Sequence, residues 1–155
     1  MALEIERKFL VTNSDYKKGA VRSFYSQGYL SDDPDRIVRV RICDDSAFLT
    51  IKSRKNDLER YEFEYPIPLS DAEVLLSLCK KPIVRKYRYT LTYKGFTWQV
   101  DEFLDENQGL VIAEIELEDS SQPFEKPHWI GKEVTSDPRY YNANLIRHPY
   151  NMWNK

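Results

Sequence analysis

The stretch Leu3-Glu4-Ile5-Glu6-Arg7-Lys8-Phe9-Leu10, close to the start of the chain, alternates charged and apolar side chains. Successive side chains of an extended strand point to opposite faces of a sheet. Glu4, Glu6 and Lys8 would therefore share one face, with apolar side chains on the other. Taken alone, this strand favours a sheet face that is open to water. The alternative is a polar cavity that holds a cation with its carboxylates and an anion with its lysine.

The same pattern recurs along the chain and decides between these two interpretations. Charged residues repeat at a spacing of two, with apolar or aromatic residues beside them. The segments concerned are Arg39-Val40-Arg41, Thr50-Ile51-Lys52, Glu62-Phe63-Glu64, Lys86-Tyr87-Arg88, the strand around Asp101, and Glu114-Ile115-Glu116. Several strands with one charged face each favour a shared polar interior.

This ordered set resembles the CYTH superfamily, the triphosphate tunnel metalloenzymes. Glu4-x-Glu6-x-Lys8 matches the signature of that family near the start of the chain, and the later charged segments follow in the family's order. Gln27-Gly28-Tyr29-Leu30 is also similar, and the run 129–135 with Arg139-Tyr140 and Asn142 resembles the end of the short bacterial members. A lone Glu-x-Glu-x-Lys would be a weak signal, but the set covers nearly the whole chain.

Length and local patterns predict one domain, residues 1–155, of the mainly antiparallel β (α+β) class. The 11 tyrosines, 7 phenylalanines and 3 tryptophans favour β-structure. Strands are expected over residues 3–10, 21–30, 36–42, 47–54, 59–66, 83–93, 96–104 and 110–118. A capping box at Ser70-Asp71-Ala72-Glu73 predicts a helix that Pro82 closes. Shorter helices are expected near 121–126 and over 137–147, the latter with Asp137 as cap and Pro138 in its first position.

About eight strands can close a barrel with a narrow interior. The resemblance implies such an eight-stranded closed barrel, a tunnel with a charged lumen and a few helices packed outside. The apolar residues between the charges should then face outward and pack beneath the helices. These residues are Ile5, Phe9, Phe63, Tyr65, Trp98, Ile115 and Leu117.

The resemblance also implies roles for the lumenal residues, and the residue types agree with them. Carboxylate oxygens favour Mg²⁺ or Mn²⁺, and the expected metal ligands are Glu4, Glu6, Asp101, Glu114 and Glu116. Arginine and lysine suit phosphate oxygens, and the expected substrate-binding residues are Lys8, Arg39, Arg41, Lys52, Lys86 and Arg88. Lys8, Lys86 and Glu114 are the expected catalytic residues, with Glu62, Glu64 and Arg139 in supporting roles.

Several of these assignments have alternatives. Glu62, Glu64 and Glu114 could equally orient the basic residues. Arg54 has the strand parity of Lys52, but at a strand end we expect a solvated arginine. Arg139 belongs either to a C-terminal lid or to a surface helix.

The expected function is metal-dependent hydrolysis of a triphosphate, with inorganic tripolyphosphate cleaved to pyrophosphate and phosphate by in-line attack of a metal-activated water. The alternatives are a class IV-type adenylyl cyclase, a thiamine or nucleoside triphosphatase, and a barrel that binds polyphosphate without turnover. A thiamine triphosphatase would place a tryptophan near the tunnel mouth, whereas parity turns Trp98, the first tryptophan, outward.

Composition excludes other classes of partner. The net charge of −2 creates no general attraction for nucleic acid or an acidic membrane. Cys43 and Cys79 are isolated, as are the two histidines, so we expect reduced thiols and no zinc site. No signal peptide or membrane-spanning run is present. We therefore expect a cytoplasmic monomer or homodimer with a small-molecule triphosphate substrate.

Overall fold

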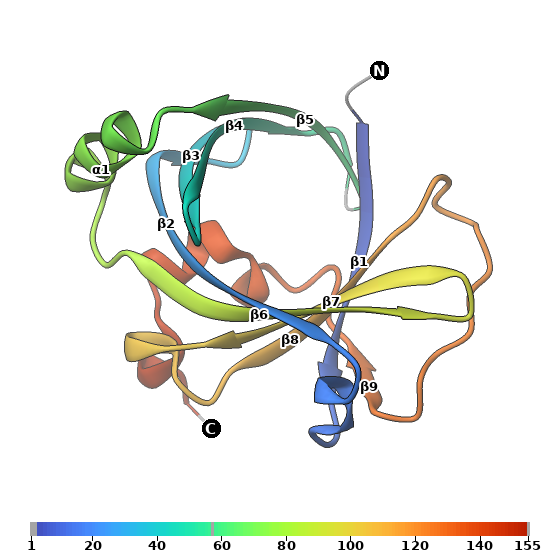
Figure 1. The fold of residues 1–155 in the computed structure, drawn as a ribbon. Coiled ribbons are helices and arrows are strands. Elements are labelled where there is room, and N and C mark those ends of the chain that lie inside the picture. Colours follow the sequence, from blue (N-terminus) through green and yellow to red (C-terminus); the bar gives the residue numbers. More distant parts are fainter. Residues whose placement is uncertain (1–2, 57, 155) are drawn as a thin grey trace.

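The computed structural model describes residues 3–56 and 58–154, and β-strands make up most of it (Figure 1). The strands are β1 (Leu3–Val11), β2 (Val21–Asp33), β3 (Arg36–Cys43), β4 (Ser46–Arg54), β5 (Glu59–Ile67), β6 (Val84–Tyr93), β7 (Phe96–Phe103), β8 (Val111–Glu116) and β9 (Ile130–Glu133). The helix α1 spans Leu69–Leu78. Short 3-10 helices lie at η1 (Asp15–Lys17), η2 (Asp105–Asn107), η3 (Pro138–Tyr140), η4 (Asn142–Ile146) and η5 (Tyr150–Met152).

Eight of the strands close into a barrel. They pair in the order β5-β4-β3-β2-β6-β7-β8-β1, and a further pairing of β5 with β1 completes the ring. The neighbouring strands are antiparallel throughout. The structure thus confirms the closed eight-stranded antiparallel barrel expected from the sequence.

Strand β1 closes the barrel with only the first part of its length. Leu3, Glu4 and Ile5 pair with β5 along one edge, and further along the same edge Phe9 and Val11 pair with β9. The short strand β9, which sequence reasoning missed, therefore occupies backbone groups that β5 leaves unpaired. This division of one edge leaves the second half of β5 without a partner on that side, and Pro66 is tolerated there because it needs no ladder hydrogen bond.

The outer face of the barrel carries most of the apolar core. Phe9, Trp98 and Ile115 are fully buried there, with Ile5 and Leu117 nearly so. A loop covers these residues: the rings of Phe124 and Trp129 each lie 5.8 Å from that of Trp98. The outward orientation of this set was predicted correctly, but a loop and not a helix provides the cover.

Phe63 and Tyr65 correct the expected outer core. Both belong to β5 and remain 44% and 53% exposed. The reason is the position of α1, which packs mainly on β2, β3 and β4 and meets β5 at its last residue, Ile67. Ala72 of α1 and Cys79, the residue after it, are buried in a cluster with Val40 and Ala47, whereas Val74 and Leu78 face solvent.

Three helix predictions also need correction. Helix α1 begins at Leu69 after Pro68, so Ser70 is not its cap. Residues 121–126 form a turn and an extended segment in place of a helix. Residues 137–147 form the two turns η3 and η4 and not one helix, although the Asp137 side chain does accept from the Arg139 amide with Pro138 in the first turn.

The C-terminal segment returns to the barrel. Residues of η3 and η4 lie across the barrel opening in Figure 1 and contribute to the wall of the central cavity. Among the residues described, no helix is long and apolar enough to cross a membrane.

Candidate active site

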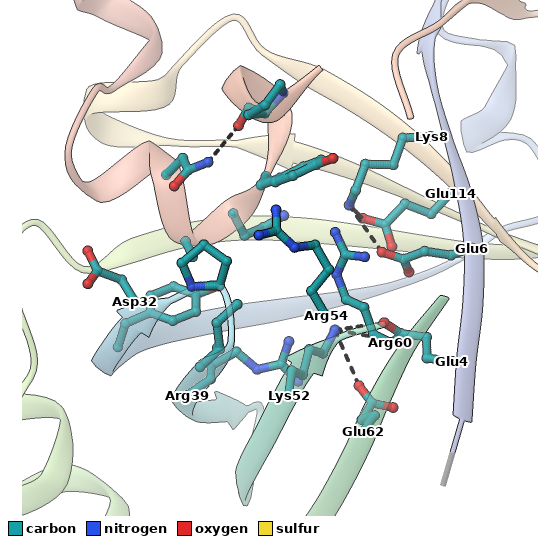
Figure 2. A pocket seen from close by; sticks show the side chains of 18 of the residues that line it. Glu4, Glu6, Lys8, Asp32, Arg39, Lys52, Arg54, Arg60, Glu62 and Glu114 are labelled. Atoms are coloured by element: carbon teal, nitrogen blue, oxygen red, sulfur yellow. Dashed lines mark hydrogen bonds and ion pairs between the residues drawn. The ribbon is translucent and has the colours of Figure 1, made fainter. Parts of the chain in front are cut away.

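A cavity of about 250 Å³ occupies the interior of the barrel (Figure 2). Its wall contains side chains from β1, β3, β4, β5, β6 and β8, because strand alternation turns one charged face of each inward. Eleven of the residues expected at the site line it: Glu4, Glu6, Lys8, Arg39, Arg41, Lys52, Glu62, Lys86, Arg88, Glu114 and Glu116. The structure thus brings together residues that are up to 112 positions apart in the chain.

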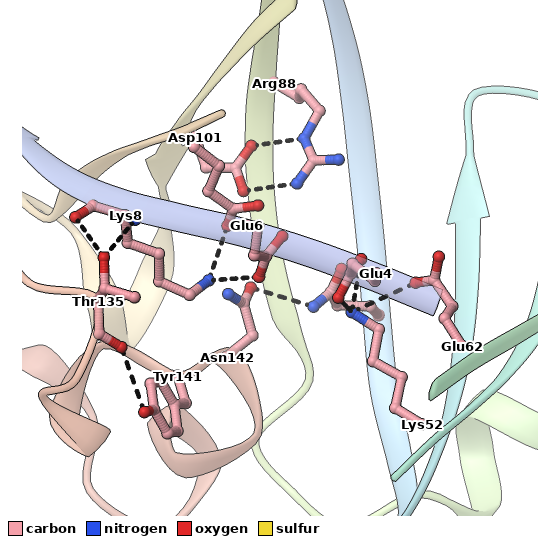
Figure 3. A network of polar contacts seen from close by, with 12 residues as sticks. Glu4, Glu6, Lys8, Lys52, Glu62, Arg88, Asp101, Thr135, Tyr141 and Asn142 are labelled. Carbon is pink, nitrogen blue, oxygen red and sulfur yellow. Dashed lines mark hydrogen bonds and ion pairs between the residues drawn. The ribbon is translucent and has the colours of Figure 1, made fainter. Parts of the chain in front are cut away.

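Two lysines form ion pairs across the carboxylate side of the cavity (Figure 3). Lys8 Nζ lies 2.9 Å from Glu114 Oε1 and 3.3 Å from Glu6 Oε1. Burial opposes the charge of Lys8, but these carboxylates outweigh it and hold the pKa of Lys8 above its usual value. Lys8 is therefore a permanent cation and a hydrogen-bond donor at neutral pH.

Lys52 repeats this arrangement on the opposite strand. Its Nζ lies 3.0 Å from Glu4 Oε1 and 3.3 Å from Glu62 Oε2. Burial again lowers the pKa of Lys52, but Glu4, Glu6 and Glu62 together outweigh it, so the net shift is upward. In the protein alone, these two lysines and their carboxylate partners thus neutralise one another.

Asp101 lies behind the cavity wall and does not line it. Both its oxygens are engaged by Arg88, at 2.7 and 2.9 Å, and Lys86 Nζ lies 2.7 Å from Oδ2. Burial would raise the pKa of Asp101, but Arg88 and Lys86 lower it to about 2. These contacts fit a residue that orients two cations, whereas the resemblance implied a metal ligand at this position.

Lys86 is fully buried, and its environment disfavours its charge. Burial lowers the pKa of Lys86 well below its usual value, and the guanidiniums of Arg88 and Arg41 act in the same direction while Asp101 opposes them. Its Nζ also donates to Asn142 Oδ1 at 2.9 Å. The C-terminal segment therefore holds one of the expected substrate-binding cations directly.

The buried amide side chain of Gln27 connects Arg41 with Asn142, the residue that also holds Lys86. Gln27 is fully buried; its Oε1 accepts from Arg41 Nε at 3.0 Å, and its Nε2 donates to Tyr29 and to Asn142 Oδ1. Sequence reasoning did not select Gln27 or Asn142 as site residues because neutral amides do not contribute to a charge pattern. The signal available was their place in the motifs that resemble the family.

Arg39 retains hydrogen-bonding capacity. Its guanidinium donates to Thr50 at 3.1 Å, but its buried Nε has no partner among the residues described. A buried donor without a partner costs free energy. An anion that accepts from Arg39 Nε would remove that cost.

The carboxylates Glu4, Glu6, Glu114 and Glu116 fit a divalent metal ion by their chemistry. Glu116 shows this most directly: burial, together with the nearby charges of Glu4 and Glu62, raises its pKa. A divalent cation such as Mg²⁺ or Mn²⁺, which prefers oxygen ligands, would offset the repulsion between these carboxylates. In the described part of the chain, however, no three acidic, cysteine or histidine side chains are already gathered closely enough to hold a metal.

Two supporting residues lie outside the cavity wall, and one residue expected in solvent lies within it. The side chain of Glu64 is 42% exposed and contacts Arg39 at 3.5 Å. Arg139 is exposed and pairs with Asp137 at 2.7 Å. The side chain of Arg54 is 48% exposed, as we expected of an arginine at a strand end, and it also lines the cavity together with Arg60.

Comparison with known proteins establishes the family. The model of the CYTH domain matches residues 2–150, so the chain belongs to the CYTH family. An inorganic triphosphatase of Acetivibrio thermocellus is 52% identical over 151 residues, which are 97% of each chain. An inorganic triphosphatase of Nitrosomonas europaea is 38% identical over 147 residues, covering 92% of this chain and 95% of that protein.

Solved structures agree with the fold. A crystal structure of an inorganic triphosphatase is similar with a TM-score of 0.68 and 33% identity, over 94% of this chain and 95% of that one. A protein from Pyrococcus horikoshii shares the fold alone, with a TM-score of 0.60 at 23% identity over 76% of this chain and 80% of that one.

Proposed function

We propose that this protein is an inorganic triphosphatase that cleaves tripolyphosphate to pyrophosphate and phosphate. The observation that carries the proposal is the cavity itself, in which eight basic side chains face a group of carboxylates inside a closed barrel. The names of the relatives at 52% and 38% identity support it. A site for anion binding alone would need the basic residues but not the carboxylates, which would repel the ligand.

The basic residues would bind and orient the phosphate chain. Arg39 and Arg41 offer planar guanidiniums, which can bind phosphate oxygens through two hydrogen bonds. Arg88 is fixed by its two contacts with Asp101, and Lys86 by Asp101 and Asn142. Phosphoryl transfer depends mainly on such positioning and on neutralising the charge of the phosphoryl oxygens.

Glu4, Glu6, Glu114 and Glu116 would hold Mg²⁺ or Mn²⁺. When bound, the metal supplies further positive charge to the phosphate oxygens and favours a water nucleophile. The protein would then release Lys8 and Lys52 from their present carboxylate partners, so that both lysines contact the substrate. Lys8 stays protonated because its pKa is raised, so it donates hydrogen bonds to the phosphate chain and is not a proton acceptor.

The competing substrates are less well supported. The tryptophans of this chain, Trp98, Trp129 and Trp153, are all buried in apolar clusters and do not line the cavity, so none is placed to stack on thiamine. Cyclisation of ATP would need the ribose oxygen aimed at the α-phosphorus, and misplacement by ~1 Å can cost about a hundredfold in rate. No tryptophan or phenylalanine stands among the described residues of the cavity wall to stack on a nucleoside base.

Product analysis tests the proposal. Purified protein is given tripolyphosphate, ATP, thiamine triphosphate or pyrophosphate with Mg²⁺ or Mn²⁺, and with chelator as control. We expect fast release of phosphate from tripolyphosphate, slow turnover of ATP, negligible cyclic AMP and no activity with chelator. Cyclic AMP as the main product of ATP would favour the cyclase instead. The cytoplasmic location, the single domain and the monomeric or dimeric state stay predictions.

A further inference from the structure

A side chain of the C-terminal segment, that of Asn142, extends into the proposed active site. Asn142 begins η4, lines the cavity and projects into the polar network of its wall (Figure 3). Its Oδ1 accepts from Lys86 Nζ at 2.9 Å and from Gln27 Nε2 at 3.1 Å. Two donors of the barrel thus occupy the amide oxygen of Asn142.

The contacts behind Asn142 fix which way its amide group faces. A guanidinium has only donors, so Gln27 must present its Oε1 to Arg41 Nε, 3.0 Å away. The Nε2 of Gln27 then faces the Tyr29 hydroxyl at 2.9 Å and the amide of Asn142. Because Nε2 is a donor, Asn142 presents its Oδ1 to the barrel wall and turns its Nδ2 the other way.

The amide nitrogen of Asn142 has no hydrogen-bond partner among residues 3–56 and 58–154. Unlike the unpaired Nε of Arg39, this nitrogen is not buried. Asn142 is half-buried and lines the cavity, so its two N–H groups can donate to a molecule that fills the cavity. Asn144 shows the contrast, because it also lines the cavity but its Nδ2 donates to the Pro138 carbonyl at 2.9 Å.

We propose that Asn142 is a substrate-binding residue, whose Nδ2 donates a hydrogen bond to a phosphoryl oxygen of the triphosphate. This inference rests on the proposed function. The oxygens of an ionised phosphate chain only accept hydrogen bonds, and Asn142, with its acceptor occupied, presents only donors toward them. A neutral donor also adds no positive charge beside Lys86, to which the guanidiniums of Arg88 and Arg41 already lie close. The barrel and the C-terminal segment thus bind the phosphate chain together.

Calorimetry with a double-mutant cycle separates direct binding by Asn142 from an effect through Lys86. Triphosphate is titrated in Mg²⁺ into the Glu6→Gln protein and into versions that also carry Asn142→Ala, Lys86→Met or both. A residue that acts only by holding Lys86 has no effect once Lys86 is replaced. We expect Asn142→Ala to raise the Kd about tenfold or more, as for the loss of a hydrogen bond to a charged group. The rise should be found with lysine and with methionine at position 86.

Asn151→Ala is the matched control, because Asn151 is an exposed asparagine of the same C-terminal segment and lies outside the cavity wall. It should leave the Kd for triphosphate unchanged. An unchanged Kd in Asn142→Ala, or a rise that disappears when Lys86→Met is present, would overturn the inference.

A second variant covers the case in which Asn142→Ala fails to fold. Asn142→Asp keeps an oxygen that accepts from Lys86 and Gln27, but its carboxylate has no donor for the phosphate chain. It should weaken triphosphate binding, and an unchanged Kd would again count against a direct contact. Lack of tripolyphosphate hydrolysis by the unaltered protein would refute the proposed function, whereas the Kd values report on Asn142 without turnover.

Discussion

At the scale of single residues, the buried contacts of Asp101 have the largest expected effect on stability. Its carboxylate balances Arg88 and Lys86, and Asp101 and Lys86 are fully buried. Asp101→Asn should lower the free energy of unfolding by about 3–5 kcal/mol, because it leaves buried cations without their anion. Urea denaturation measures this loss.

The matched control is Asp105→Asn. Asp105 pairs with Arg85 at 3.5 Å, and both side chains are 48% exposed. An exposed pair contributes about 0–1 kcal/mol, and asparagine tolerates the positive φ of this position. Equal losses for the two variants would show that Asp101 does not balance the buried cations.

Asp32 should make stability depend on pH in the acid range. The hydrogen bond from Arg147, with further help from Lys80, lowers the pKa of Asp32 to about 2 from an ordinary 3.8. A lowered pKa gives stability that is present above pH 4 and is lost as the pH falls toward 2. Its partners are half-exposed, so we expect about 1–2 kcal/mol.

Comparison of the unaltered protein with Asp32→Asn in urea at pH 7 and at pH 2.5 measures this effect. The difference in unfolding free energy should be largest at pH 7 and shrink at the lower pH. A difference that stays constant over this range would contradict the role assigned to Asp32.

Arg41 tests the substrate-binding side of the cavity. Its Nε is held by Gln27, and its pKa, lowered to about 10 by burial and by Arg39 and Arg88, still leaves it charged at neutral pH. Arg41→Ala should weaken triphosphate binding by ~1.5–3 kcal/mol. Lysine should restore only part of this because it lacks the planar fork. Calorimetry on the Glu6→Gln background measures the affinity for triphosphate. An unchanged affinity in Arg41→Ala would refute the assignment of Arg41 as a substrate-binding residue.

At the scale of elements, strand alternation predicted the polar interior because most strands have one charged and one apolar face, and the family resemblance implied the closed barrel. The hairpin at Lys94-Gly95 was also predictable, because two-residue hairpin turns favour a glycine. In the structure both residues adopt the positive φ that such a turn requires. The 3-10 turns of residues 138–146 and the strand β9 were not, because they are too short to show a period. Asp101 has the same inward parity as the expected metal ligands, so parity alone could not tell that Arg88 and Lys86 enclose it.

The contact between α1 and β2 depends on one glycine. A Cβ at Gly28 would lie 2.7 Å from Cys79 Cβ, at the end of α1, and 2.8 Å from Ile83 Cδ1. Gly28→Ala should therefore cost about 1–3 kcal/mol of stability, the usual cost of overpacking. Ser26→Ala, on the same face of β2, is the control and should change stability by less than about 0.5 kcal/mol. Thermal unfolding of both variants measures the difference. Equal melting temperatures would contradict the role of Gly28 in the contact between α1 and β2.

At the scale of the whole molecule, the barrel gathers charges that no single element could hold. The cavity carries six basic and five acidic residues of the expected site, and in the protein alone Lys8 and Lys52 are paired with carboxylates of the wall. Metal and phosphate chain can replace these internal pairs together. We propose that this exchange makes the cavity a metal-dependent triphosphatase.

Phosphate release from tripolyphosphate at saturating Mg²⁺, measured for the unaltered protein and for Glu6→Gln, tests that claim most directly. We predict steady release by the unaltered protein and none by Glu6→Gln. The variant should still fold with only a modest loss in melting temperature, because Lys8 keeps its contact with Glu114 at 2.9 Å, although the lowered pKa of Glu6 shows that its charge favours the folded protein. Near-normal activity in Glu6→Gln, or release by the unaltered protein that persists after the metal is chelated, would contradict the account.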